Sequence, residues 1–261
     1  MKSRLFPIVL VAALAVMLSG CGKKETQETA EQKAPAAAAT PIDMATVGEV
    51  TGTVTLDGAP PAFKPINMSA EPYCVKAHST PVLPQDVVVG DKGALANVIV
   101  YVKDGLGDRT FDVPKQPAQL DQKGCTYDPH VVALMAGQEL QVVNSDQTTH
   151  NIHPMPRDNR EWNKSQPPGA SPIEDTFARA EVAIPVKCNV HPWMKSYIGV
   201  FKNPYFQVTS KNGAFDLKNL PPGTYTLEAW HEKYGTSDQT VTIGPKETKT
   251  VTFVFKAASG D

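Results

Sequence analysis

One short segment constrains this chain more than any other: Cys188-Asn189-Val190-His191-Pro192-Trp193-Met194, which holds a thiol, an imidazole and a thioether within seven residues. Thiolate and thioether sulfurs favour Cu(I), imidazole binds both oxidation states of copper, and the three together select copper. A second imidazole is still needed to complete such a site. The best candidate lies upstream in Thr149-His150-Asn151-Ile152-His153, which follows an alternating strand. The sequence therefore predicts a copper site built from two distant segments.

These two segments resemble the ligand pattern of the cupredoxins, in particular amicyanin and plastocyanin, over roughly residues 90–205. The resemblance implies a Greek-key β-sandwich that binds one mononuclear copper ion. It implies a set of four ligands: His150, Cys188, His191 and Met194. It also implies that Asn151 ties the two ligand loops together.

The same residues also fit plainer structural roles. Taken alone, Cys188 is equally well explained as half of a disulfide, and a His-Pro pair often forms a turn. The order and spacing of all the ligand types favour the metal site over that alternative. His153 follows His150 by three residues, so strand alternation turns its side chain to the opposite face. We therefore expect His153 at the rim of the site.

Composition favours an all-β fold. The chain has 261 residues, of which 41% are hydrophobic, so it can bury the core of one or two domains. It contains 23 prolines and 18 glycines and no long apolar stripe of helical period, which favours strands and turns over helices. The net charge of −2 gives no indication of nucleic-acid binding.

The beginning of the chain resembles a bacterial lipoprotein signal. Lys2 and Arg4 precede an apolar run of about 13 residues, which is too short for an ordinary membrane span. We expect residues 1–20 to be removed and Cys21 to carry lipid, a plain cleaved signal peptide being the alternative. Residues 21–46 are polar and rich in alanine, and they predict a disordered tether. The expected protein is exported and lipid-anchored to a bacterial membrane, facing the periplasm or the cell exterior.

The two remaining cysteines, Cys74 and Cys125, predict a disulfide, because an exported chain folds in an oxidising compartment. Closing a loop of about 50 residues would stabilise the fold by roughly 4 kcal/mol in the chain-entropy model. The alternative is a second metal site, since His78 lies near Cys74 and His130 lies near Cys125.

The last part of the chain has a different character. The stretch from Asn212 to Trp230 alternates turns with strands and carries the pattern G-x-F-x-L-x-x-L-P-P-G-x-Y-x-L. This pattern resembles the carboxypeptidase regulatory-like domain, a small transthyretin-like β-sandwich. Because such a sandwich serves many proteins, the resemblance implies a fold and says little about function.

The opening strand of that family has its counterpart far upstream, at Gly52–Pro60. We therefore predict a regulatory-like sandwich that is split in the sequence by the copper domain. The predicted domains are residues 47–68 together with 206–256, and residues 69–205 for the copper domain. Within the latter, residues 96–102 predict a strand whose valines face inward. A linear order, with Val50–Leu56 as a cupredoxin strand, is the alternative.

The predicted function is a lipid-anchored carrier of single electrons that exchanges them with a redox partner protein. In cupredoxins the histidine of the cysteine loop has its ring edge at the surface, and His191 would take that position here. An apolar collar would surround it: Pro192, Trp193 and Met155. Such a patch suits brief docking, in which interfaces are small.

Other functions fit the same residues. The protein could store or deliver copper in the cell envelope, or it could be a surface binding module with a vestigial site. An enzyme with a small-molecule substrate is not expected, because a site with these ligands leaves no free coordination position. His231 directly follows Trp230 at a strand end. It is expected either to approach the copper loop or a partner, or to be a solvated histidine.

Overall fold

The computed structural model describes residues 38–257. The predicted signal peptide at residues 1–20, the lipid site at Cys21 and most of the tether at residues 21–46 lie outside the described residues. The described chain consists of β-strands with a single short α-helix, α1 (Pro72–Lys76), and a 3-10 turn, η1 (Asp91–Gly93), which confirms the all-β prediction. No helix in this part of the chain is long and apolar enough to cross a membrane.

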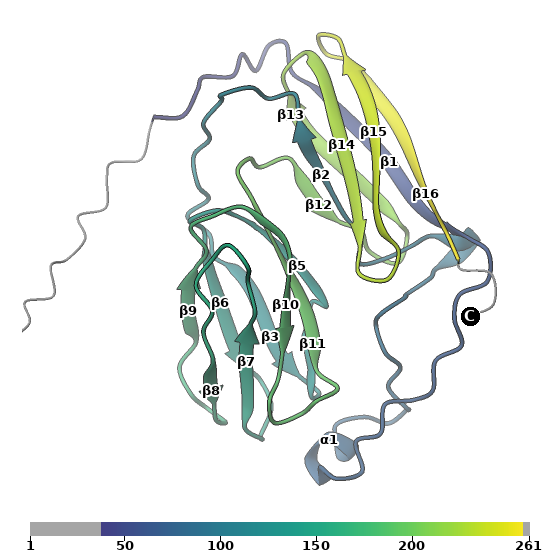
Figure 1. The fold of residues 1–261 in the computed structure, drawn as a ribbon, viewed down its shortest axis with the longest axis vertical. Helices are drawn as coiled ribbons and strands as arrows, with labels where there is room; N and C mark the ends of the chain where they lie inside the picture. Colours follow the sequence, from purple (N-terminus) through teal and green to yellow (C-terminus); the bar gives the residue numbers. More distant parts are fainter. Residues whose placement is uncertain (1–37, 258–261) are drawn as a thin grey trace, which may run out of the picture. The chain divides into compact units, whose positions relative to one another are not determined.

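The strands form four sheets (Figure 1). The sheets β13-β1-β16 and β12-β2-β14-β15 enclose one hydrophobic core, and we call them the first sandwich. Its strands are β1 (Gly48–Asp57), β2 (Ile99–Asp104), β12 (Phe206–Val208), β13 (Ala214–Leu220), β14 (Gly223–His231), β15 (Gly235–Ile243) and β16 (Thr248–Lys256).

The sheets β5-β11-β10-β7-β8 and β4-β3-β6-β9 enclose another core, and we call them the second sandwich. Its strands are β3 (Ala118–Lys123), β4 (Thr126–Asp128), β5 (Val131–Met135), β6 (Glu139–Asn144), β7 (His150–Pro154), β8 (Lys164–Gln166), β9 (Ile173–Thr176), β10 (Glu181–Lys187) and β11 (Lys195–Phe201). Both candidate ligand segments belong to this sandwich.

β1 pairs with strands from the far end of the sequence. Thr51 lies beside Thr250 of β16 in a parallel pair and beside Asp216 of β13 in an antiparallel pair. A Cβ atom at Gly52 would lie 2.0 Å from the Val251 carbonyl oxygen, so this position requires glycine. The buried side chains of β1 are Val50, Val54 and Leu56. The division of the chain into domains stays a prediction.

β2 lies in the first sandwich, whereas the predicted boundaries placed this strand within residues 69–205. It pairs with β12 and β14. On one face, Val100 and Val102 of β2, with Val98 just before the strand, enter the first core. On the other face Ile99 and Tyr101 pack with Val131 and Phe201. Because both faces are buried, such an apolar run fits a central strand of either sandwich, and the sequence pattern did not distinguish them.

Residues 66–82 form a closed segment that contains α1, and we call it the cap. The Ile66 N–H donates to the Val82 carbonyl at 2.8 Å, which closes the base of the cap. Cys74 of α1 is joined to Cys125 by a disulfide, which confirms the predicted pair. Met68 and Cys74 are buried in the core of the second sandwich. The cap is therefore fixed to the second sandwich at several points.

The disulfide excludes the alternative metal cluster, because bonded sulfurs cannot serve as thiolate ligands. His78 Nε2–H donates to the Gly124 carbonyl at 2.6 Å. His130 Nε2 pairs with the Glu232 carboxylate. Both histidines thus have structural partners.

His231 is the last residue of β14, and 0% of it is exposed, so the prediction of a solvated histidine is wrong. Its ring stacks on Tyr234 with a centroid distance of 4.9 Å and packs near Phe255. Its Nδ1 accepts the Lys233 N–H at 3.1 Å, which leaves the proton of a neutral ring on Nε2. Burial lowers the pKa of His231 to about 4.

We expect His231 to make the fold sensitive to acid. The unfolded chain binds a proton at this residue below about pH 6.5, while the folded chain does so only near pH 4, so the free energy of unfolding falls between these values. The loss at pH 5 relative to pH 7.5 is about 2 kcal/mol. Urea unfolding at both pH values measures it. His231→Gln should lose about 2 kcal/mol less than the parent, and equal losses would contradict the prediction.

Candidate copper site

Three candidate ligand atoms converge between β7 and β10. His150 begins β7 and Cys188 follows β10, and these strands pair with Lys187 beside His153. His150 Nδ1 and His191 Nδ1 are 2.9 Å apart, and Cys188 Sγ lies 4.0 Å from His191 Nδ1. The three ligand atoms all lie within 4.8 Å of one another. A thiol and two imidazole nitrogens therefore share one buried position.

The ligand loop is closed by its own backbone. The Cys188 N–H donates to the Met194 carbonyl at 3.2 Å, and the Met194 N–H donates to the His191 carbonyl at 2.9 Å. The His191 N–H donates to Cys188 Sγ at 3.4 Å. Met194 is buried in the same core cluster as Cys188. The short spacing of the motif thus produces a tight loop that keeps Cys188, His191 and Met194 together.

Asn151 joins the two ligand segments, as the resemblance implied. Its Oδ1 accepts the Asn189 N–H at 3.0 Å, and its Nδ2 donates to the Lys164 carbonyl at 3.2 Å. His153 points elsewhere, because its Nε2 pairs with Glu161 at 2.5 Å. His153 is not part of the described cluster of ligand atoms, and it lies half-buried beside it.

The electrostatics of the cluster favour a metal-binding thiolate. Burial alone would raise the pKa of Cys188, but hydrogen bonds from His150 and from the backbone of the loop hold it below its ordinary value. Burial would lower the pKa of His150, but its hydrogen bonds with Asp146 and Cys188 raise it. Burial and the neighbouring His150 both lower the pKa of His191.

Asp146 is a residue of the site that the sequence analysis missed. Its Oδ2 lies 2.8 Å from His150 Nε2, and the same oxygen accepts the Cys125 N–H at 2.7 Å. Its Oδ1 accepts the Gly124 N–H at 2.7 Å and the Tyr73 hydroxyl at 3.2 Å. A carboxylate on the outer nitrogen of a ligand histidine fixes the tautomer and the ring orientation. The available signal was an aspartate four residues before His150, which is weak by itself.

The predicted surface position of His191 is wrong. His191 is 0% exposed, because the cap covers it and places Glu71 Oε2 3.9 Å from its Nε2. This Nε2 is buried and has no hydrogen-bond partner among the described residues.

The three residues of the predicted collar differ in exposure. Trp193 is half-buried, its ring lies 5.1 Å from that of His191, and its Nε1–H donates to the Cys125 carbonyl at 3.0 Å. Pro192 is exposed and Met155 is half-buried. The contacts of Trp193 hold the ligand loop against the disulfide turn, and the docking role of these residues stays a prediction.

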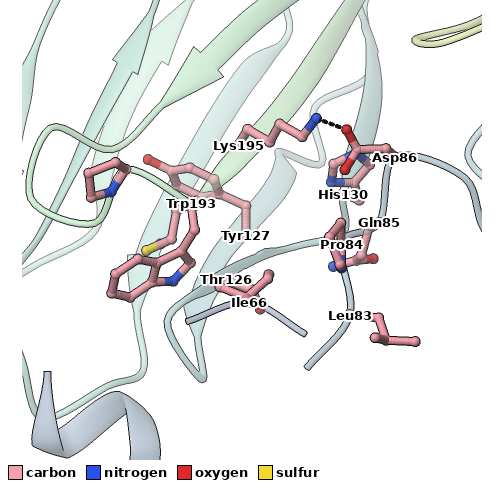
Figure 2. A pocket seen from close by; sticks show the side chains of 12 residues that line it. Ile66, Leu83, Pro84, Gln85, Asp86, Thr126, Tyr127, His130, Trp193 and Lys195 are labelled. Carbon is pink, nitrogen blue, oxygen red and sulfur yellow. Dashed lines mark hydrogen bonds and ion pairs between the residues drawn. The ribbon is translucent and has the colours of Figure 1, made fainter. Parts of the chain in front are cut away.

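A pocket of about 240 Å³ adjoins the ligand loop (Figure 2). Figure 2 shows Trp193 and Tyr127 on one side of it and Lys195, His130 and Asp86 on the other. Lys195 pairs with Asp86, and His130 pairs with Glu232 just outside the pocket. The charged groups that line the pocket are thus paired within the protein.

One family model matches part of the chain. Residues 204–256 match the family model of the carboxypeptidase regulatory-like domain. No curated protein matches the sequence. The predicted resemblance to that domain is thus confirmed for the stretch in which its pattern was found.

Solved structures that match part of this chain include the following three. A copper-containing nitrite reductase, NirK, from Thermus scotoductus SA-01 is 19% identical, with a TM-score of 0.32 over 38% of this chain. The chain spans 25% of that reductase. A purple cupredoxin from Nitrosopumilus maritimus is 20% identical, with a TM-score of 0.28 over 32% of this chain and 98% of its own. An oxidised mutant of amicyanin is 14% identical, with a TM-score of 0.30 over 39% of this chain and 97% of its own.

The donor set fits copper. Two imidazole Nδ1 atoms and a thiolate face one another, and a buried thioether lies in the same loop, which is the ligand chemistry that copper prefers. The outer nitrogen of His150 is bound by Asp146, so its Nδ1 is left for a metal.

We expect Asp146→Asn to weaken copper binding by about 10- to 100-fold, because the amide cannot hold His150 as a carboxylate does. Competition with a chelator of known affinity measures the loss for Cu(I) and Cu(II). Asp158→Asn, at an exposed loop position, is the matched control and should bind as the parent does. Parent-like affinity of Asp146→Asn would show that the carboxylate does not support the ligand.

Proposed function

We propose that His150, Cys188, His191 and Met194 bind one copper ion and that the protein is a single-electron carrier. The observation that carries this proposal is the buried convergence of the two Nδ1 atoms and the Cys188 sulfur within 4.8 Å. Copper bound by such ligands supplies one-electron redox chemistry between Cu(II) and Cu(I).

The chain's own contribution is to keep the ligands still. Asp146 holds the ring of His150, and Asn151 holds the ligand loop through the Asn189 N–H. The backbone bonds of Cys188 and Met194 close that loop. Ligands that are fixed before and after electron transfer need little rearrangement, and their burial excludes water from the site.

The proposal includes neither catalysis nor a small-molecule substrate, because the four side chains would leave no coordination position for one. It includes export, which the Cys74–Cys125 disulfide supports, since disulfides persist in oxidising compartments. Anchoring through lipid on Cys21 and exchange with a redox partner protein remain part of the same proposal.

We expect Cys188→Ser to abolish any intense visible charge-transfer band of the copper-loaded protein, because that band requires a copper–thiolate bond. Absorption spectra of the loaded parent and variant measure it, and circular dichroism of both checks the fold. A Cys188→Ser spectrum identical to that of the parent would remove Cys188 from the site and with it the proposed function.

A carrier and a copper-delivery protein differ in what happens on reduction. We expect cyclic voltammetry to give a reversible one-electron couple, and we expect the reduced protein to retain its metal against a Cu(I) chelator such as bicinchoninate. We expect this because the ligands are buried beneath a cap that a disulfide fixes. Rapid loss of Cu(I) to the chelator would favour storage or delivery instead.

A further inference from the structure

The outer nitrogens of both ligand histidines lead to the cap, that of His191 directly and that of His150 through Asp146. His191 Nε2 lies 3.9 Å from Glu71 Oε2. His150 Nε2 lies 2.8 Å from Asp146 Oδ2, and Asp146 Oδ1 accepts the Tyr73 hydroxyl at 3.2 Å. Glu71 and Tyr73 flank the first residue of α1. Two short routes from the candidate ligands therefore end at the same few residues of the cap.

The ligand loop does not offer an equivalent route through His191. That ring is 0% exposed, and the cap over it is fixed by the disulfide and by Met68 in the core. A partner cannot touch His191 without displacing the cap. It can touch the cap itself, where Pro72 and Val75 are exposed and Tyr73 is half-buried.

We propose that electrons enter and leave through the cap, along the hydrogen-bonded chain His150–Asp146–Tyr73, and that α1 is the surface on which the redox partner docks. This inference rests on the proposed carrier function. In the transfer, the acceptor gains the one electron that the site loses, no bond forms or breaks, and the Tyr73 hydroxyl keeps its proton. The proposed docking surface therefore lies on the cap, which precedes β2 in the sequence, and not on the ligand loop.

The chemistry of this surface indicates the kind of partner. Its exposed apolar side chains are Pro72 and Val75, the latter 51% exposed. The half-buried Glu71 and the exposed Lys76 carry opposite charges, so the local net charge is zero. The fitting partner is therefore a redox protein whose contact patch is small and largely uncharged, and whose docking depends little on ionic strength.

The first experiment interrupts the hydrogen-bonded route from His150 to Tyr73 by removing one oxygen atom. Tyr73→Phe removes only the hydroxyl that Asp146 accepts, while Tyr197→Phe removes a half-buried hydroxyl that faces Glu232 instead. The reduced, copper-loaded full chains are mixed with tris(phenanthroline)cobalt(III), and oxidation is followed by stopped-flow absorbance. We expect Tyr73→Phe to react severalfold more slowly with an unchanged absorption spectrum, and Tyr197→Phe to react as the parent does. Equal rates in all three proteins would overturn the route through Tyr73.

The second experiment locates the contact surface with a matched pair of valines. Val75 lies on the cap and Val190 lies in the ligand loop, and they are 51% and 46% exposed. Each is replaced by Glu and by Lys, and oxidation by the cationic cobalt complex is compared with oxidation by anionic hexacyanoferrate(III). Each rate is corrected for the reduction potential measured on the same variant.

Opposite charges attract and raise the encounter rate, and salt screens the effect. We expect Val75→Glu to speed the reaction with the cobalt complex and to slow that with hexacyanoferrate, with Val75→Lys doing the reverse. If the corrected rates follow the charge at Val190 alone, the ligand loop is the contact surface and the inference is wrong. If the parent shows no reversible couple, both the carrier function and this inference are wrong. If it shows a reversible couple but its rates do not change with substitutions at Tyr73 and Val75, only this inference is wrong.

Discussion

A single buried carboxylate joins the parts of this molecule that matter for the copper site. Asp146 is 3% exposed and takes hydrogen bonds from His150, Tyr73 and the backbone of Gly124 and Cys125. An unpaired carboxylate at this depth would cost several kcal/mol, so its charge depends on these donors. Burial would raise its pKa, but the bonds from His150 and the two backbone N–H groups hold it below its usual range. The hydrogen bonds of Asp146 therefore hold the disulfide turn, the cap and a ligand histidine in one arrangement.

The ligand set of the site could be predicted because most of its residues are close together in the sequence. Cys188, His191 and Met194 stand close enough in sequence that any compact loop brings them together. The pairing of Cys74 with Cys125 followed from redox compartment and from the uses assigned to the other cysteines, without geometry. Strand alternation was sufficient for the all-β fold, since period-2 patterns rarely fit helices.

The contacts that could not be predicted join segments that are distant in sequence. Asp146 is an ordinary acidic residue of a loop, and its neighbours do not indicate that Tyr73 and Gly124 point towards it. The sequence of the cap lacks hydrophobic periodicity, so no local pattern predicts its structure. Its position over His191 depends on the disulfide and on the burial of Met68, which no local pattern encodes. Analogy with cupredoxins therefore placed His191 at the surface, where it does not lie.

The central place of β1 in its sheet constrains the order in which the chain can fold as it is synthesised. β1 lies between β13 and β16, and neither exists until most of the chain has been made. Every strand of the second sandwich precedes β13. The second sandwich can therefore fold while both edges of β1 are still unpaired. Long-range pairing of this kind is slow and exposes the chain to aggregation. A chain truncated after β11 would thus have its metal ligands assembled while its first strand is free to pair with another molecule.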